Sequence, residues 1–408
     1  MEMKVINGGV CAPLGFKANG IHAGIRKNKS KIDLSLIKSD VLANCAAAYT
    51  SNLVKGAPIY VTRSNINNGK AIAMICNSGN ANTCNADGVE IATQTCELLA
   101  KAACINSQDV IIASTGVIGL PLSIKPFEEN MDILVKGLAQ DEAHASLAEQ
   151  GIMTTDTTPK HCAVSINIGG KEVKIGAMTK GSGMINPALA TMLCFITTDA
   201  KISSICLDKA LHMAIDSSFN MLSIDGDTST NDMVSIMANG LAENKEITEL
   251  DNDFNKFLDA LTYVCQTLAK MMAKDGEGAT KLITCKVTNA KTLKDARLVA
   301  KSVISSSLLK AAMFGADANW GRVLCAIGYS KADVNIEKVD MSFASKVGKI
   351  DVCKNGFGIS FSEEVAKKIL LEDEIEILID LKDGGFDSEA YGCDLTYDYV
   401  KINGDYRS

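Results

Sequence analysis

Apolar and polar residues follow two different periods along this chain, and these periods predict an alternation of strands and helices. Residues 71–82 read as a buried strand that runs into a polar loop, and Asp87 is placed to cap a helix over residues 88–103. That helix carries an apolar stripe made of Val89, Ile91, Ala92, Leu98, Leu99, Ala102 and Ala103. Residues 109–119 then predict a short apolar strand that ends in a turn containing glycine.

The remaining pattern continues this mixture to the end of the chain. In order, the further predicted elements are a helix containing Ile133, Leu134 and Leu138, a hairpin over 161–183 that turns at Gly169 and Gly170, a strand over 192–196, a long amphipathic helix over 254–273, a strand over 280–287, a helix over 293–313 and a strand over 374–381. Hairpins among helices favour an α+β fold built of layers over one doubly wound sheet.

The composition excludes several classes of protein. The 408 residues include 41 Lys and Arg against 48 Asp and Glu, a net charge of −7. An acidic chain lacks the positive surface that nucleic-acid binding requires, so no nucleic-acid partner is expected. No apolar run reaches the ~18 residues of a membrane span, and the first ten residues lack the apolar core of a secretory leader. We therefore expect a cytoplasmic protein without a membrane partner.

Cysteine and histidine give no sign of a metal site. The chain has 14 cysteines, but no two are closer than eight residues, so the CxxC spacing of metal and redox motifs is missing. Its four histidines are not paired at helical spacing. We expect the cysteines to be small buried residues in a reducing compartment, and no metal to be bound.

A threonine follows a glycine-rich turn in the sequence KGSGMINPALATML. Gly181 and Gly183 allow unusual backbone angles, and Pro187 stiffens the approach. Thr191 opens an apolar strand, and by itself a threonine at such a place is most often structural. The alternative is self-cleavage of the Ala190–Thr191 bond by the Thr191 hydroxyl. The freed α-amine would then act as general base beside its own hydroxyl.

A second candidate lies at the end of the strand predicted over 109–119. The sequence STGVIG can direct a hydroxyl from Thr115 and a backbone N–H from Gly116 at one point, as an oxyanion hole requires. The alternative is an ordinary turn after a strand.

The sequence DGDTSTND over residues 225–232 suggests a different chemistry. It resembles the nucleophile loop of haloacid-dehalogenase phosphatases, in which Asp225 would be the nucleophile and Asp227 would help to hold Mg²⁺. Ser229 departs from that loop, and no second acidic element follows. An EF-hand is excluded because Thr230 stands where glycine is needed. A capped polar turn remains the alternative.

Two charged residues beside glycines are candidates for substrate binding. Glu277 lies between Gly276 and Gly278 at a predicted helix end, where it suits a substrate ammonium or amide. Lys180, just before the possible cleavage bond, suits a substrate carboxylate. The alternatives are a glycine C-cap with solvated charges and an exposed lysine.

These segments occur together in one order along the chain. STGVIG, MTTDTTPK, KGSGMINPALATML, DGDTSTND, KDGEGATK and the NGDYRS tail, with CNSGNANTCNADG and GADANWGR, resemble the ornithine acetyltransferase (ArgJ-type glutamate N-acetyltransferase) family of arginine biosynthesis. The resemblance covers nearly the whole chain. It implies an α+β, layered α/β sandwich of the self-cleaving ArgJ/DmpA-like type with an N-terminal threonine nucleophile.

The resemblance also implies a role for particular residues. Cleavage at Ala190–Thr191 would divide the chain into an α chain of residues 1–190 and a β chain of residues 191–408, with Thr191 as nucleophile. Thr115 and Gly116 match the oxyanion hole. The positions that match substrate binding are Thr154 with Thr155 beside it, Lys180, Thr191, Glu277, Asn403 and Ser408. Of the first two, Thr154 is favoured without being settled.

The C-terminal tail is polar and would by default be frayed. If Asn403 and Ser408 reach substrate, something must hold the tail in place. Leu395, Tyr397 and Tyr399 alternate with polar residues, which predicts a strand that leads the tail toward the site. Many members of the family end in threonine, and Ser408 keeps the hydroxyl.

The reaction implied is acetyl transfer through an acetyl-threonine intermediate. Thr191 would take the acetyl group from N²-acetyl-L-ornithine, release ornithine and pass the group to L-glutamate in a ping-pong sequence. This chemistry needs no cofactor. The resemblance leaves acetyl-CoA open as a second donor, and it implies a heterotetramer of two α and two β chains. The rival functions are an amidase or aminopeptidase of the same fold, with water as acceptor, and the Mg²⁺-dependent phosphatase.

Overall fold

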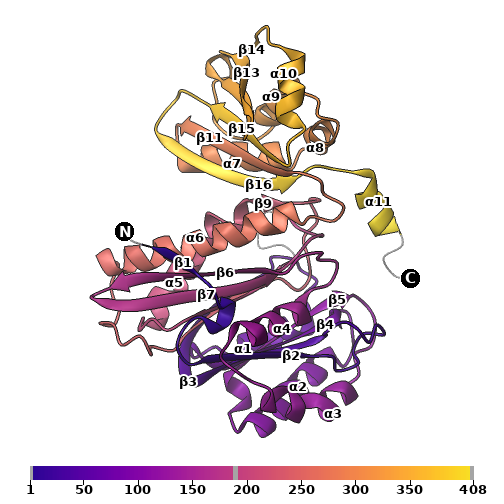
Figure 1. Ribbon diagram of the computed structural model, residues 1–408, viewed down its shortest axis with the longest axis vertical. Helices are drawn as coiled ribbons and strands as arrows, with labels where there is room; N and C mark the ends of the chain where they lie inside the picture. The colour runs from indigo at the N-terminus through magenta and orange to yellow at the C-terminus, as the bar shows by residue number, and fades with distance from the viewer. Residues whose placement is uncertain (1–2, 187–191, 405–408) are drawn as a thin grey trace. The chain divides into compact units, whose positions relative to one another are not determined.

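The computed structural model describes residues 3–186 and 192–404. The chain forms two compact units (Figure 1). Unit 1 comprises Met1–Gly181, Ala188–Ile215 and Thr228–Leu268, and unit 2 comprises Ser182–Pro187, Asp216–Asp227 and Ala269–Ser408. The cleavage expected after residue 190 is a cut in the covalent chain, and its position does not coincide with a boundary between these units.

Unit 1 is built on a mixed nine-stranded sheet. Its elements are β1 Lys4–Ile6, η1 Gly9–Cys11, β2 Phe16–Ile21, β3 Leu34–Tyr49, α1 Ala57–Asn65, β4 Lys70–Asn80, α2 Gly88–Ala103, η2 Ser107–Asp109, β5 Val110–Val117, α3 Lys125–Lys136, α4 Glu142–Ile152, β6 Lys160–Ile168, β7 Lys171–Lys180, β8 Leu193–Thr198, α5 Ser204–Asp216, β10 Met233–Ala238 and most of α6 Asn252–Lys274. The strand order is β1-β6-β7-β8-β10-β3-β4-β5, with β2 beside β3. Only β4–β5 and β8–β10 run parallel among these pairs.

Both faces of this sheet are buried, and the strand sequences show why. Along β5, Val110 and Ile112 belong to one apolar core, while Ile111 and Ala113 belong to the other. Successive side chains of a strand point to opposite faces, so a continuous apolar run needs cover on both. Helix α4 packs against β2 and β3 with one core, and α2 and α3 pack beside each other in the second core.

Unit 2 is built on a seven-stranded sheet. Its elements are η3 Phe219–Met221, β9 Leu222–Ser223, β11 Leu282–Ala290, α7 Leu293–Ile304, α8 Ser307–Phe314, α9 Trp320–Gly328, η4 Ile336–Lys338, β12 Asp340–Ser345, β13 Gly348–Lys354, β14 Phe357–Gly358, α10 Glu363–Leu370, β15 Glu374–Asp380, β16 Phe386–Cys393 and α11 Tyr397–Gly404. The strand order is β14-β13-β12-β15-β11-β16-β9.

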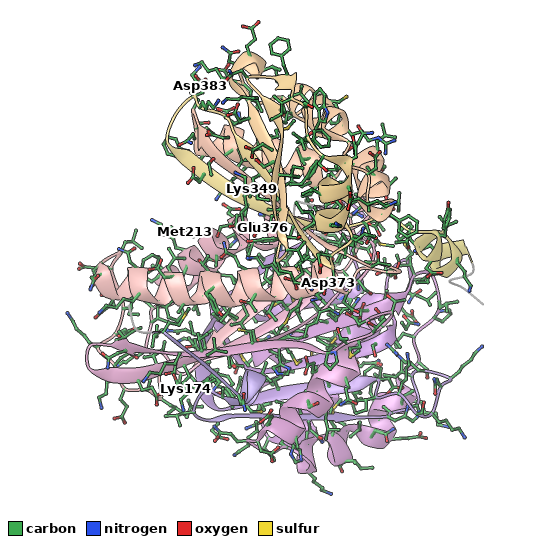
Figure 2. The ribbon with its side chains drawn as sticks, turned by 45° about the horizontal axis from the view of Figure 1, so that its top comes forward. Lys174, Met213, Lys349, Asp373, Glu376 and Asp383 are labelled. Atoms are coloured by element: carbon green, nitrogen blue, oxygen red, sulfur yellow. The ribbon has the colours of Figure 1, made fainter. Side chains whose placement is uncertain are left out.

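The sheet of unit 2 is apolar on one face and charged on the other. Ile375, Ile377 and Ile379 of β15 are buried in the core that α7 covers. Glu376, labelled in Figure 2, alternates with these isoleucines along the strand and pairs with Lys286 of β11. This alternation is typical of a sheet with one face against a core and one face in water.

The α+β class and most predicted elements are confirmed. The strands expected over 109–119, 192–196, 280–287 and 374–381 are present, and the hairpin of β6 and β7 turns at Gly169 and Gly170 as expected. Within the predicted helices, Val89 and Ile133 are exposed rather than buried, and Leu138 follows the end of α3. No helix in the part of the chain that the structure describes is long and apolar enough to span a membrane.

Two predicted elements are wrong. The helix expected over 293–313 is two helices, because the Ser306 hydroxyl accepts the N–H of Leu309 and starts a new helix there. The strand expected from Leu395 to Tyr399 is instead the start of α11. The Thr396 hydroxyl accepts the N–H of Tyr399 at 3.2 Å, which provides the helix with a cap and outweighs the alternating pattern.

Candidate active site

Thr115 and Gly116 lie at the end of β5, where this strand pairs in parallel with β4. Their partners in the register are Ser78 and Gly79. Gly116 has a φ angle of 131°, and a Cβ atom there would lie 2.4 Å from the carbonyl carbon of Gly79. Another residue could not take this backbone without displacing β4. The two residues predicted to form an oxyanion hole therefore lie on a strand end whose geometry requires glycine.

The end of β5 is held by buried amide and hydroxyl groups. Asn231 Nδ2 donates to the carbonyl oxygens of Ser114 and Ala81 at 2.9 and 2.6 Å. The Thr83 hydroxyl donates to Asn231 Oδ1 at 2.7 Å, and the Ser114 hydroxyl donates to Asn77 Oδ1 at 2.6 Å. Buried networks of this kind fix one arrangement of the backbone. The CNSGNANTCNADG segment thus supports the strand end that carries Thr115.

Lys180 brings a positive charge to Thr115. It is the last residue of β7 and is 4% exposed, and its Nζ donates to Thr115 Oγ1 at 3.3 Å. A hydroxyl that accepts a hydrogen bond keeps its own proton for donation to another group. The Lys180 ammonium therefore leaves the Thr115 O–H available for an oxyanion.

The carboxylate of Asp156 lies in the same buried cluster. Its Oδ1 accepts the Lys160 ammonium at 2.8 Å and the N–H of Gly181 at 2.7 Å, and its Oδ2 accepts the N–H of Thr154 at 2.9 Å. Asp156 thereby joins the MTTDTTPK segment to the end of β7. Thr154 and Thr155 are both half-buried, and the structure does not choose between them as a substrate contact.

Burial and charge act against each other in this cluster. Burial lowers the pKa of Lys180, and the negative charge of Asp156 partly offsets that effect. Burial also disfavours the ionised form of Asp156, but the charges of Lys180 and Lys160 outweigh it and lower the pKa of Asp156 to about 2. At neutral pH the cluster therefore holds an ionised carboxylate beside two lysines.

Ala190 and Thr191 lie outside the described residues, and so does Ser408. The first described residue after the expected cleavage bond is Met192, whose N–H donates to Asp232 Oδ1 at 2.8 Å. Strand β8 begins at the next residue, one position after the start of the strand predicted over 192–196.

Within unit 2, Glu277 and Asn403 form a polar pair. Glu277 is buried, its N–H donates to the Ser182 carbonyl at 2.7 Å, and its Oε2 accepts Asn403 Nδ2 at 2.8 Å. A Cβ atom on Gly183 would lie 2.4 Å from the Glu277 carboxylate, so glycine is needed for this close approach. The structure therefore brings together two residues that the sequence placed 126 positions apart.

The C-terminal helix is tied to the loop that carries Glu277. The Thr396 hydroxyl donates to the carbonyl of Gly278 at 2.7 Å. Gly278 has a φ angle of 67°, and a Cβ atom there would lie 2.5 Å from the nitrogen of Tyr399. The glycine thus permits the start of α11 to lie against this loop, and Asn403 follows one turn later on the same helix.

The DGDTS sequence does not form a metal site. Asp225 accepts backbone N–H groups from Met184, Ile185 and Asp227, and it also accepts the Tyr399 hydroxyl. Among the described residues, no group of three or more His, Cys, Asp or Glu side chains could hold a metal ion. Burial, the largest effect, raises the pKa of Asp225. The phosphatase interpretation has no support from this geometry.

The comparison with known families is decisive. A sequence model of the ArgJ family matches residues 17–408. The chain belongs to the ArgJ family. It is therefore an enzyme of the kind that the order of motifs predicted.

Individual ArgJ relatives cover the full chain. The arginine biosynthesis bifunctional protein ArgJ of Caldanaerobacter subterraneus subsp. tengcongensis is 47% identical over 407 residues, 100% of both chains. The protein of the same name from Symbiobacterium thermophilum is 47% identical over 408 residues, again 100% of both. Among solved structures, that of ArgJ from Bacillus halodurans is 48% identical, covers 52% of this chain and 97% of that chain, and has a TM-score of 0.49.

Some residues of the site in this ArgJ chain escaped sequence reasoning. Asp156 lies inside the MTTDTTPK motif, but nothing in its spacing shows that its carboxylate pairs with Lys160 and lies near the charge of Lys180. In the sequence, Asn231 and Asp232 stand out only as the last two residues of the DGDTSTND segment. The sequence offered one signal for these two residues, which is their residue type. An asparagine or aspartate before an apolar strand is often a turn residue, whereas here both side chains are buried.

The cysteines follow the prediction in the main. Cys84, Cys104 and Cys325 are exposed, and the others are buried; all are free thiols. Burial raises the pKa of several of them, for example that of Cys162 to about 11, so these thiols are not activated nucleophiles.

Proposed function

We propose that this protein is an acetyltransferase of arginine biosynthesis that moves the acetyl group of N²-acetyl-L-ornithine to L-glutamate. The observation that carries the proposal is the match over the whole chain to relatives named arginine biosynthesis bifunctional protein ArgJ. The buried cluster around Thr115 supports it, because acyl transfer needs hydrogen-bond donors for a developing oxyanion.

The proposed nucleophile is Thr191 after cleavage of the Ala190–Thr191 bond. The freed α-amine takes the hydroxyl proton while Oγ attacks the acetyl carbonyl carbon. The tetrahedral intermediate collapses as the amine of ornithine leaves with that proton, and acetyl-threonine remains. The glutamate amine then attacks the acetyl ester, gives a proton to the α-amine and restores the hydroxyl.

In unit 1, the Thr115 O–H and the Gly116 N–H would donate to the oxyanion. The Thr115 hydroxyl is suited to this role because it accepts from Lys180 and keeps its proton for the oxygen of the intermediate. The Lys180 charge favours negative charge nearby, whether on the intermediate or on a substrate carboxylate, and Thr154 or Thr155 supplies a further substrate contact.

In unit 2, Glu277 and Asn403 suit the ammonium of an α-amino acid. A buried carboxylate that already accepts one amide hydrogen bond retains acceptor capacity for a cation. Ser408 is proposed to contribute on the strength of the family resemblance. The same head-group contacts would serve both ornithine and glutamate, because each substrate carries an α-amino acid head and the two react in turn in a ping-pong sequence.

The experiment that tests this function combines intact mass with an acetyl-transfer assay. The wild-type protein should consist of fragments 1–190 and 191–408. It should turn acetylornithine over to ornithine only when glutamate is present, with N-acetylglutamate as the second product. The Thr191→Ala variant should remain one inactive chain, whereas Thr191→Ser keeps a hydroxyl and should still be cut.

An uncut wild-type chain with full activity would contradict the proposal. Hydrolysis of acetylornithine without glutamate would instead indicate the amidase alternative. Repeating the assay with acetyl-CoA as the only acetyl donor tests the second activity of a bifunctional enzyme. We further propose a cytoplasmic heterotetramer of two α and two β chains, which the mass of the native protein in solution tests.

A further inference from the structure

The acidic segment 225–232 contacts the chain on both sides of the residues that include the proposed cleavage bond. Its first residue makes the contact on the N-terminal side, within unit 2. Asp225 Oδ2 accepts the N–H of Met184 at 2.5 Å, and its Oδ1 accepts the N–H of Ile185 at 2.9 Å. In return, the backbone N–H of Ile224 donates to the carbonyl of Ile185 at 2.9 Å.

The last residue of the segment makes the same kind of contact on the C-terminal side, within unit 1. Asp232 Oδ1 accepts the N–H of Met192 at 2.8 Å, and the N–H of Met233 donates to the Met192 carbonyl at 3.0 Å. Each aspartate thus accepts a backbone N–H of the chain, and a neighbour of each aspartate donates to a carbonyl of the same stretch. Six residues, 186–191, separate Ile185 from Met192.

Burying the carboxyl group of Asp232 costs more free energy than a purely local backbone contact would justify. It is 1% exposed, and no hydrogen bond from the described residues reaches its Oδ2. Burial raises its pKa well above the ordinary range, although the Met192 N–H, the Lys180 charge and the nearby Ser229 and Thr50 hydroxyls oppose the shift.

We propose that Asp225 and Asp232 are positioning residues for self-cleavage, each fixing the backbone on one side of the Ala190–Thr191 bond. This inference rests on the proposed function. Each hydrogen bond restricts the backbone on its own side of the bond, so fewer backbone conformations compete with the one that reacts.

The cleavage itself needs no atom from either aspartate. The Thr191 Oγ–C bond to the Ala190 carbonyl carbon forms, the C–N bond breaks, and the hydroxyl proton ends on the α-nitrogen. Water then hydrolyses the ester to a carboxylate on Ala190 and a free hydroxyl on Thr191. The aspartates act only through the backbone N–H groups that they hold.

Asp199 provides a matched control. It is a buried carboxylate of unit 1 that accepts the N–H groups of Leu14 and Lys174 at 3.0 and 2.8 Å, and burial raises its pKa as well. It follows the far end of β8, about 20 Å along the strand from Met192 at the usual rise per residue. A change at Asp199 therefore removes the same type of contact away from the bond.

The experiment follows the rate at which fragments 1–190 and 191–408 appear after a pulse of synthesis, by denaturing gel and intact mass. Each of Asp225, Asp232 and Asp199 is changed to Leu, which keeps the shape and removes the acceptor, and to Asn, which keeps one acceptor oxygen. We expect Asp225→Leu and Asp232→Leu to slow cleavage by about tenfold or more, the scale of a modest misplacement of reacting groups. Asp232→Asn, Asp199→Asn and Asp199→Leu should be cut at close to the wild-type rate. Asp225→Asn loses one of the two oxygens that accept backbone N–H groups and should be cut at a rate between those of wild type and Asp225→Leu.

The outcomes separate this inference from the proposed function. Wild-type cleavage rates in both Asp225→Leu and Asp232→Leu overturn the inference and leave the function intact. Slow cleavage in Asp232→Asn also overturns it, because that variant keeps the acceptor. Equal slowing in Asp199→Leu overturns it as a general effect on folding. An uncut wild-type chain overturns the proposed function and this inference with it.

Discussion

Single residues of unit 1 hold the predicted oxyanion hole in an arrangement that costs free energy. Gly116 adopts a φ angle that other residues rarely take, and Lys180 is an almost fully buried ammonium. Asp156 offsets part of the free-energy cost of burying Lys180, since its carboxylate lies among the charges of Lys180 and Lys160. Strain and buried charge of this kind are concentrated at functional sites, where positioning matters more than stability.

At this scale we predict the effect of removing the Thr115 hydroxyl. Thr115→Ala should lower kcat for acetyl transfer by roughly two to three orders of magnitude, because one oxyanion donor is lost. Thr115→Ser keeps the hydroxyl and should retain most of the activity. Steady-state kinetics with acetylornithine and glutamate measure the effect, and thermal unfolding checks that both variants remain folded. A wild-type kcat in Thr115→Ala would remove this residue from the site.

At the scale of elements, helix α11 holds the tail that the default interpretation leaves frayed. Thr396 both caps the helix and binds the loop of Gly278, and Asn403 reaches Glu277 from the same helix. Helix α11 has no buried residues. The structure shows it held by these polar contacts, by the hydrogen bond from the Tyr399 hydroxyl to Asp225 and by the edge-to-face packing of Phe314 and Tyr397. A helix attached in this way should be easy to detach.

We therefore predict that deletion of residues 403–408 raises KM for both acetylornithine and glutamate, because both substrates use the same head-group contacts. Thr396→Val should act in the same direction, since it removes the cap and the hydrogen bond to Gly278. Lys401→Ala, an exposed position on the same helix, is the control and should leave both KM values unchanged. Self-cleavage should survive in all three variants. Unchanged kinetics in the deletion would cancel Asn403 and Ser408 as substrate contacts.

At the scale of the whole molecule, the chain passes repeatedly between its two units, and it does so inside its most specific motifs. The KGSGMINPALATML sequence begins in unit 1, enters unit 2 at Ser182 and returns to unit 1 at Ala188. The DGDTSTND sequence crosses once more, between Asp227 and Thr228. The covalent cut proposed after residue 190 would therefore divide both units between two chains, and noncovalent packing would have to keep them together.

For the stability of the fold, we predict a specific dependence on acid through Asp156. Its pKa is lowered from 3.8 to about 2, so its ion pairs stabilise the folded protein fully above about pH 4, and this stabilisation is lost as the pH falls through about 2. The shift corresponds to roughly 2 kcal/mol. Asp156→Asn should lower the unfolding temperature at pH 7, and the difference from wild type should shrink between pH 4 and pH 2. A difference that stays constant over that range would contradict the prediction.

The local pattern of this sequence determined much of the fold. Buried strands such as β5 and β15 and the long helix α6 have periods that no competing signal disturbs. The pattern failed where a single hydroxyl decided the outcome. Ser306 divides a predicted helix, and Thr396 turns a predicted strand into α11, because a cap fixes the first turn of a helix against a weak alternation.

For the site, residue types and the order of motifs determined which side chains matter, and they led to Thr115, Lys180, Glu277 and Asn403. Only the tertiary structure decided which of these lie together, Lys180 against Thr115 and Asn403 against Glu277, and only it revealed Asp156 and Asp232 as buried neighbours of Lys180. The physical reason is that burial sets the cost of a charge and the need for a partner, and burial comes from strands and helices far apart in sequence.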